Sequence, residues 1–202
     1  VLLVSLEADE INVPLPKDSI LHWSENIPAI APADYVNWND VRELEMGGWE
    51  LDGERKIMIS RDLMLRFEEF SLHNIQSLND SRSDDYVWEG VDGKRALWWT
   101  ALADTSRHLF METKRHVMIS DASDWITNSI RNLSSSGLGI ISEPQVDWDT
   151  GGLDAILIGT FHPAISGGII LGCWERSTGS KGRIFLSIVD GKVRVKVCPV
   201  RP

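Results

Sequence analysis

Three Asp-Gly pairs, each between short runs of β-forming residues, constrain the fold of this chain more than any other feature. They are Asp52-Gly53, Asp92-Gly93 and Asp190-Gly191. An Asp-Gly pair suits the positive φ angles of a tight type I′ turn, which joins two antiparallel strands. The sequence therefore predicts three β-hairpins, at residues 49–59, 86–98 and 183–198.

The hairpin nearest the C-terminus has the most regular pattern. Residues 192–197 alternate strictly between a cation and a valine, so that Lys192, Arg194 and Lys196 share one face of the predicted strand. Cations on an edge strand prevent unwanted pairing with another sheet. Cations on an exposed face also suit the docking of an anion, such as nucleic acid, phospholipid or an acidic protein segment. Both interpretations stay open from the sequence.

The charge is distributed unevenly along the chain. Residues 1–54 carry twelve acidic side chains against two basic ones, whereas residues 176–202 carry seven basic side chains against one acidic one. The formal net charge of the whole chain is −10. Phosphate contacts dominate nucleic-acid binding, so this acidity opposes the approach of a nucleic acid. We therefore expect a protein partner or a homo-oligomer, and no nucleic acid.

The N-terminal part of the chain shows neither helical nor strand periodicity. Four prolines between residues 14 and 32 remove backbone donors and restrict φ, so this part cannot hold a long helix or a central strand. We expect an extended, proline-rich arm at about residues 12–40, within a single domain spanning residues 1–202. No signal peptide is visible, and no apolar stretch approaches the roughly 20 residues that span a bilayer. We therefore expect a soluble protein without a transmembrane segment.

Apolar residues recur with helical spacing in three segments, residues 60–78, 98–118 and 121–133. Asp121 and Ser123 are both suited to cap the third helix, which should end at the run of serines before Gly137. Further strands are expected at residues 153–161 and 168–174. This order predicts an α+β fold, an antiparallel sheet of hairpins with about three helices and a β-rich C-terminal half.

The second expected helix carries a metal-capable side chain at every fourth position. Asp104, His108, Glu112 and His116 follow this spacing, which places neighbouring members on adjacent turns of one face. The row is about 18 Å long, so only neighbouring members can share one ion. The pattern is typical of a solvated helix stripe and also of a metal site around His108, Glu112 and His116.

A glycine-rich segment between two expected strands holds a histidine and a serine. His162 and Ser166, with Asp154 upstream, are the residue types of a base, a nucleophile and an orienting carboxylate. The backbone N–H groups of the following glycines are suited to hold an oxyanion. The same segment is also typical of an ordinary turn with an incidental histidine.

Nine tryptophans are spread over the whole chain, and we expect most of them in the core. Trp148 is the tryptophan most expected to be exposed, because it lies between Asp147 and Asp149 just before two glycines, although an isolated loop tryptophan also commonly folds back on the core. An exposed indole between two acids suits a sugar or a protein partner. The two cysteines, Cys173 and Cys198, are expected to be free and mostly buried.

These features favour a non-catalytic interaction or assembly protein. Its acidic N-terminal arm would contact a partner or the basic C-terminal hairpin of another copy, through Lys192, Arg194, Lys196 and Trp148. The alternatives are a hydrolase, either metal-assisted or directed at carbohydrate with Asp147 and Asp149 as carboxylates, and a sugar- or peptide-binding module.

Overall fold

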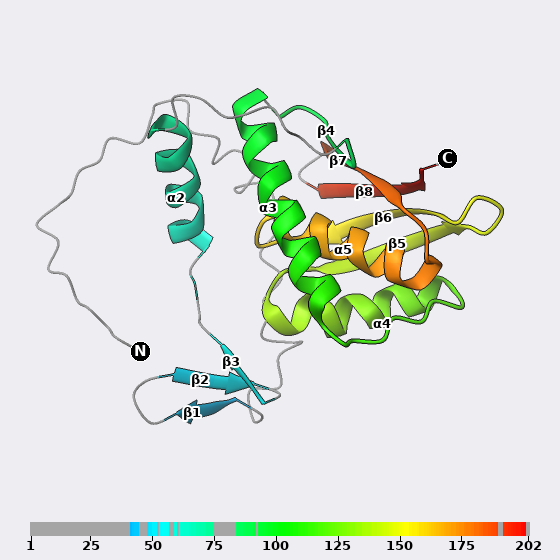
Figure 1. Cartoon of the computed structure of the whole chain (residues 1–202), viewed down its shortest axis with the longest axis horizontal. Helices are drawn as coiled ribbons and strands as arrows, with labels where there is room; N and C mark the ends of the chain where they lie inside the picture. The colour runs from blue at the N-terminus through cyan, green and yellow to red at the C-terminus, as the bar shows by residue number, and fades with distance from the viewer. Residues whose placement is uncertain are drawn as a thin grey trace, which may run out of the picture.

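The computed structural model describes residues 41–44, 48–51, 53–56, 59, 61–74, 84–91, 93–189 and 192–200 (Figure 1). Within these residues it has four α-helices and two sheets, and the C-terminal half is rich in strands. The predicted α+β class is therefore confirmed. The arm predicted at residues 12–40 lies outside the described residues, and the single domain stays a prediction.

The smaller sheet is antiparallel and contains the first predicted hairpin. Its strands follow one another in the order β1 (Arg42–Leu44), β2 (Gly48–Leu51) and β3 (Glu54–Lys56). Gly53, in the turn between β2 and β3, has a φ of 76°, the positive value that the turn requires.

The larger sheet has five strands in the order β4-β7-β8-β6-β5. Their bounds are β4 (Tyr86–Trp88), β5 (Ile140–Asp147), β6 (Gly152–Ile158), β7 (Gly182–Val189) and β8 (Lys192–Pro199). The third predicted hairpin is confirmed, since β7 and β8 pair antiparallel from Val189 opposite Lys192 onward. The sheet is mixed rather than antiparallel throughout, because β4 runs parallel to β7.

The second predicted hairpin is wrong. Strand β4 forms, but the chain then enters α3 (Gly93–Glu112) instead of a returning strand. The buried residues of α3 explain this outcome because, apart from the adjacent pair Trp99 and Thr100, they recur every three or four positions, as in a helix facing a core. They are Arg95, Trp99, Thr100, Ala103, Ser106 and Phe110.

Two further helices were predicted correctly. Helix α2 spans Arg61–Asn74 and helix α4 spans Ala122–Asn132. Asp121 caps α4 through a capping box, in which its side chain accepts hydrogen bonds from the backbone N–H groups of Ser123 and Asp124. The chain then passes through a short 3-10 helix, η3 (Ser134–Ser136), to Gly137.

The strand predicted at residues 168–174 is wrong, since this segment lies inside helix α5 (Pro163–Thr178). Its glycines allow α5 to approach its neighbours closely. A Cβ on Gly168 would lie 2.1 Å from the carbonyl oxygen of Ala103 in α3, and one on Gly172 would lie 2.8 Å from the ring of Phe110. Glycine here permits helix packing and does not mark a turn.

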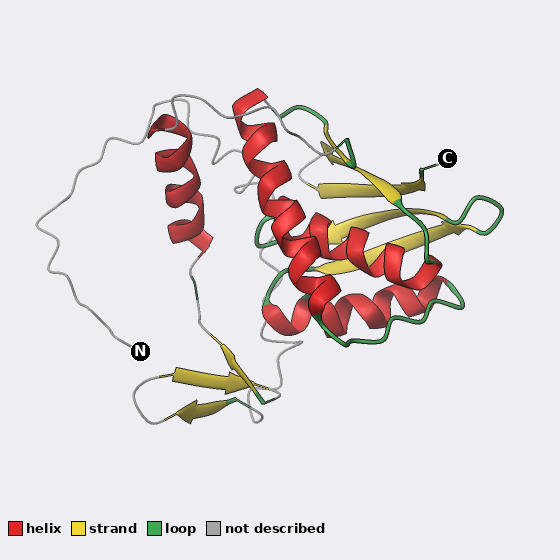
Figure 2. Ribbon diagram, in the orientation of Figure 1, coloured by secondary structure: helices red, strands yellow, loops and turns green. Residues whose placement is uncertain are grey.

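Helices α3, α4 and α5 lie on one face of the five-stranded sheet, and α2 lies beside α3 (Figure 2). Helix α5 packs on β7 and β8, α4 packs on β5, and α3 packs on α5. The core between these layers contains four buried tryptophans, Trp88, Trp99, Trp125 and Trp174. Among the described residues, no helix has the length and apolar character needed to cross a bilayer.

Candidate functional site

Strand β8 is the middle strand of the five and presents two different faces. Its three alternate valines face the helices, and each is at most 1% exposed. The side chains on the opposite, open face are exposed cations, Lys192, Arg194 and Lys196. Because β8 is hydrogen-bonded to β7 on one side and to β6 on the other, protection of a sheet edge does not explain these cations.

Arg194 is held in place by Asp154 of β6. The guanidinium donates from Nε to Oδ1 at 2.9 Å and from Nη2 to Oδ2 at 2.7 Å. These hydrogen bonds hold the pKa of the Asp154 carboxyl below its ordinary value and raise that of Arg194. The two opposite charges of the pair cancel each other. Because the pair is partly exposed to water, it contributes little to the stability of the fold.

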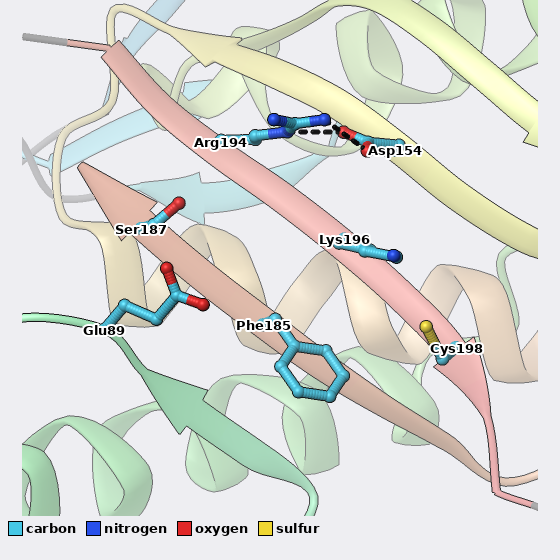
Figure 3. A pocket seen from close by; sticks show the side chains of 7 residues that line it. All are labelled: Glu89, Asp154, Phe185, Ser187, Arg194, Lys196 and Cys198. Carbon is cyan, nitrogen blue, oxygen red and sulfur yellow. Dashed lines mark hydrogen bonds and ion pairs between the residues drawn. The ribbon is translucent and has the colours of Figure 1, made fainter. Parts of the chain in front are cut away.

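The open face is hollowed beside β8 into a groove of about 360 Å³. The side chains that line it come from β6, β7, β8 and the turn after β4 (Figure 3). They are Glu89, Asp154, Phe185, Ser187, Arg194, Lys196 and Cys198. The faint helices in Figure 3 lie behind the sheet, so the groove opens on the uncovered face.

The strand register places these side chains in two neighbouring rows. Phe185 of β7 lies opposite Lys196, which lies opposite Asp154 on the other side. Ser187 lies opposite Arg194 in the next row. The groove therefore has an aromatic ring and a hydroxyl on its β7 side and cations along β8.

The structure does not bring His162, Ser166 and Asp154 together. His162 and Ser166 are both fully buried on the helical side of the sheet, whereas Asp154 points to the open face. Ser166 Oγ donates to the carbonyl oxygen of Leu138 at 2.7 Å. In this arrangement the serine hydroxyl secures the backbone, and Asp154 does not orient the histidine.

His162 belongs instead to a buried network of charged side chains. Its Nδ1 accepts a hydrogen bond from the backbone N–H of Ala164, so the proton is on Nε2, which donates to Glu68 Oε2 at 2.6 Å. Glu68 Oε1 accepts from Arg95 Nε at 2.9 Å and from Trp99 Nε1 at 3.0 Å. The network thus links α2, α3 and the start of α5.

Burial and hydrogen bonding act on Glu68 in opposite directions. Burial raises the pKa of its carboxyl, but the hydrogen bonds from His162 and Trp99 and the charge of Arg95 lower it below the ordinary value. Glu68 is therefore an ionised carboxylate inside the helical layer. Sequence reasoning missed this network because its members lie up to 94 residues apart, and no spacing rule joins them.

The four metal-capable side chains predicted to lie on one helix are not all on that helix. Helix α3 ends at Glu112, so His116 lies beyond it, while His108 and Glu112 are exposed on its final turns. Within the part of the chain that the structure describes, no group of three or more histidine, cysteine or carboxylate side chains is placed to hold a metal ion.

The turn between β5 and β6 presents Trp148, which is 60% exposed as expected. Asp147 stabilises this turn, because its carboxylate accepts hydrogen bonds from the hydroxyl and backbone N–H of Thr150 and from the N–H of Asp149. The Thr150 hydroxyl is the main cause of the lowered pKa of Asp147. This carboxylate is occupied in shaping the turn.

The two cysteines are free, as predicted. Cys198 lies on the expected strand, whereas Cys173 lies on a helix instead of a strand. Cys173 is buried in α5, and burial raises the pKa of its thiol to about 12. Cys198 is half-buried on β8 and lines the groove.

The sequence matches no protein-family model, and no curated protein matches it.

Proposed function

We propose that this chain is a non-catalytic interaction protein, in which the open sheet face around β8 binds the acidic first quarter, residues 1–54, of a second copy. The observation that carries this proposal is the exposed row of cations on a strand that is paired on both sides. Because these cations have no edge to protect, their placement is better explained by a partner of opposite charge.

Charge complementarity supports the choice of partner. Residues 1–54 carry a net charge of −10, and residues 176–202 carry a net charge of +6. Alternate residues of a strand lie about 6.7 Å apart on one face, so an extended acidic segment can place alternate carboxylates against the cations of β8. Lys192 and Lys196 make no side-chain hydrogen bond or ion pair with other described residues, whereas Arg194 is already paired with Asp154.

The two proposed surfaces differ from each other, so the contact between copies is heterologous. Such contacts form a ring, an open chain or a dimer in which the two copies exchange segments. Since the attraction is between exposed charges, it weakens as the Debye length falls below about 10 Å above 0.1 M salt. The proposal therefore predicts a salt-sensitive oligomer.

The molar mass of the 22.7 kDa chain, measured by light scattering after size exclusion at low and high salt, tests this proposal. We expect a multimer at low salt that dissociates as salt rises. The double variant Lys192→Glu, Lys196→Glu should be monomeric at both salt concentrations, because it places anions where the acidic segment binds.

A matched control carries the same charge change on the helical side of the molecule. Lys94→Glu with Lys114→Glu gives the same net charge as the first variant, at two exposed positions away from β8. This control should assemble as the wild type does. A wild-type chain that is monomeric at every salt concentration, or a control that loses assembly equally, would overturn the proposal.

A further inference from the structure

The groove on the open face holds one cation and one anion that make no direct ion pair with another side chain that the structure describes. Arg194 and Asp154 cancel each other through two hydrogen bonds. Lys196 and Glu89 line the same groove, and neither makes a side-chain hydrogen bond or ion pair with any other residue that the structure describes. Each interacts with the central pair only through its charge, Lys196 with Asp154 and Glu89 with Arg194. The groove is thus close to neutral overall but has two separate, opposite charges.

The strand register gives the spacing between the backbone positions of Glu89 and Lys196. Val87 of β4 lies opposite Phe185 of β7, which lies opposite Lys196 of β8, and Glu89 follows Val87 by two residues. Two strand spacings across and two residues along the strand put the Cα atoms of Glu89 and Lys196 about 12 Å apart. Both side chains border the groove from opposite sides, with Phe185 and Ser187 between their strands (Figure 3).

The space between the charges suits a small molecule with an apolar middle. Phe185 is half-buried in the groove, and its ring offers an apolar surface. The Ser187 hydroxyl beside it is able to donate or accept a hydrogen bond. A volume of about 360 Å³ is at the lower end of the range for small-molecule sites.

We infer that this groove binds a small aliphatic zwitterion of the amino-acid class, with its carboxylate on Lys196, its ammonium on Glu89 and its carbon chain over Phe185. A ligand with only a carboxylate would be repelled by Glu89, and a ligand with only an ammonium would be repelled by Lys196. The two charges together therefore select for a molecule that carries both.

This inference goes beyond the proposed function because it depends on Glu89, which is not part of the cation row. Both kinds of binding use Lys196, so a bound zwitterion would compete with the acidic segment. A Glu89→Gln variant separates the two, since it should lose the zwitterion while keeping the salt-sensitive assembly.

Isothermal titration calorimetry of the whole chain tests the inference with four probes. L-leucine and γ-aminobutyrate carry both charges at different separations, whereas N-acetyl-L-leucine lacks the ammonium and L-leucinamide lacks the carboxylate. We expect at least one zwitterion to bind at least about tenfold more tightly than either blocked analogue, because each blocked analogue loses one of the two charge-assisted contacts. Failure of both zwitterions to bind, or equal binding of a blocked analogue, would overturn the inference.

Variants of the two charged residues then locate the binding. Glu89→Gln and Lys196→Met should each weaken the binding of the zwitterion about tenfold or more. Glu112→Gln and Lys181→Met make the same chemical changes at exposed positions outside the groove and should leave it unchanged. Thermal unfolding followed by circular dichroism checks that all four variants fold. Folded Glu89 and Lys196 variants that bind as the wild type does would place the ligand elsewhere and overturn the assignment.

Discussion

The two sides of the five-stranded sheet use charged hydrogen bonds in opposite ways. On the helical side, the carboxylate of Glu68 is 2% exposed and is surrounded by Arg95 and His162, which are 4% and 0% exposed. On the open side, the side chains of Arg194 and Asp154 are 56% and 28% exposed. Similar contacts therefore differ in energy, because water screens the open pair and cannot reach the buried one.

This difference in exposure distinguishes charges that stabilise the fold from charges that are available for contacts with another molecule. Removing one member of a buried group leaves its partners charged and desolvated, so these contacts hold helices together. Exposed charges contribute little to folding and can be used in contacts with another molecule. Substitutions on the helical side should therefore lower the free energy of unfolding more than substitutions on the open side.

The largest effect is expected for Glu68→Gln, which keeps the shape of the side chain and removes its charge. Arg95 and His162 then lose a carboxylate partner in a desolvated site, so we expect the free energy of unfolding to fall by about 3 kcal/mol at neutral pH. Urea denaturation measures this loss. A cost of less than about 1 kcal/mol would show that the buried network contributes no more to stability than an exposed ion pair does.

The same variant has a predicted pH dependence. The pKa of Glu68 in the folded protein lies below its ordinary value of 4.5, so its stabilisation is fully present above about pH 4.5 and is lost as the pH falls through the folded value. The amide that replaces this carboxyl in the variant does not titrate. The difference in unfolding free energy between wild type and variant should therefore narrow below about pH 4.5, and a constant difference would contradict the assigned ionisation.

The next effect concerns the close approach of α3 and α5. Gly168→Ala places a methyl group against the backbone of Ala103, and we expect a loss of about 2 kcal/mol in unfolding free energy from overpacking. Gly93→Ala is the control, because its Cβ meets no heavy atom within 4 Å and should be neutral or stabilising by up to about 1 kcal/mol. Equal effects of the two alanines in urea denaturation would refute the packing explanation.

The smallest effect is expected on the open face. Arg194→Ala removes both hydrogen bonds to Asp154, but exposed pairs contribute under about 1 kcal/mol. The free energy of unfolding should change by less than this amount, and the change should shrink further at high salt. A loss as large as that for Glu68→Gln would show that the two sides do not differ as described.

The sequence predicted part of the candidate site and missed the rest. Lys192, Arg194 and Lys196 were placed on one exposed face by alternation alone, and Trp148 was placed in an exposed turn. Glu89 and Phe185 were missed because only the pairing of β4 with β7, and of β7 with β8, brings them beside the cations. The partners of Glu68 were missed for the same reason, since they come from two other segments of the chain.

Local structure could be predicted from the sequence where a segment has a clear hydrophobic period or a helix-capping side chain. Alternation defined β8, and the two candidate caps, Asp121 and Ser123, placed the start of α4 to within two residues, because these signals act between near neighbours in the chain. The run of apolar residues and glycines in α5 has no such period, and it was mistaken for a strand. Tertiary structure decided its conformation, because a helix with glycines at 168 and 172 is the form that packs closely against α3.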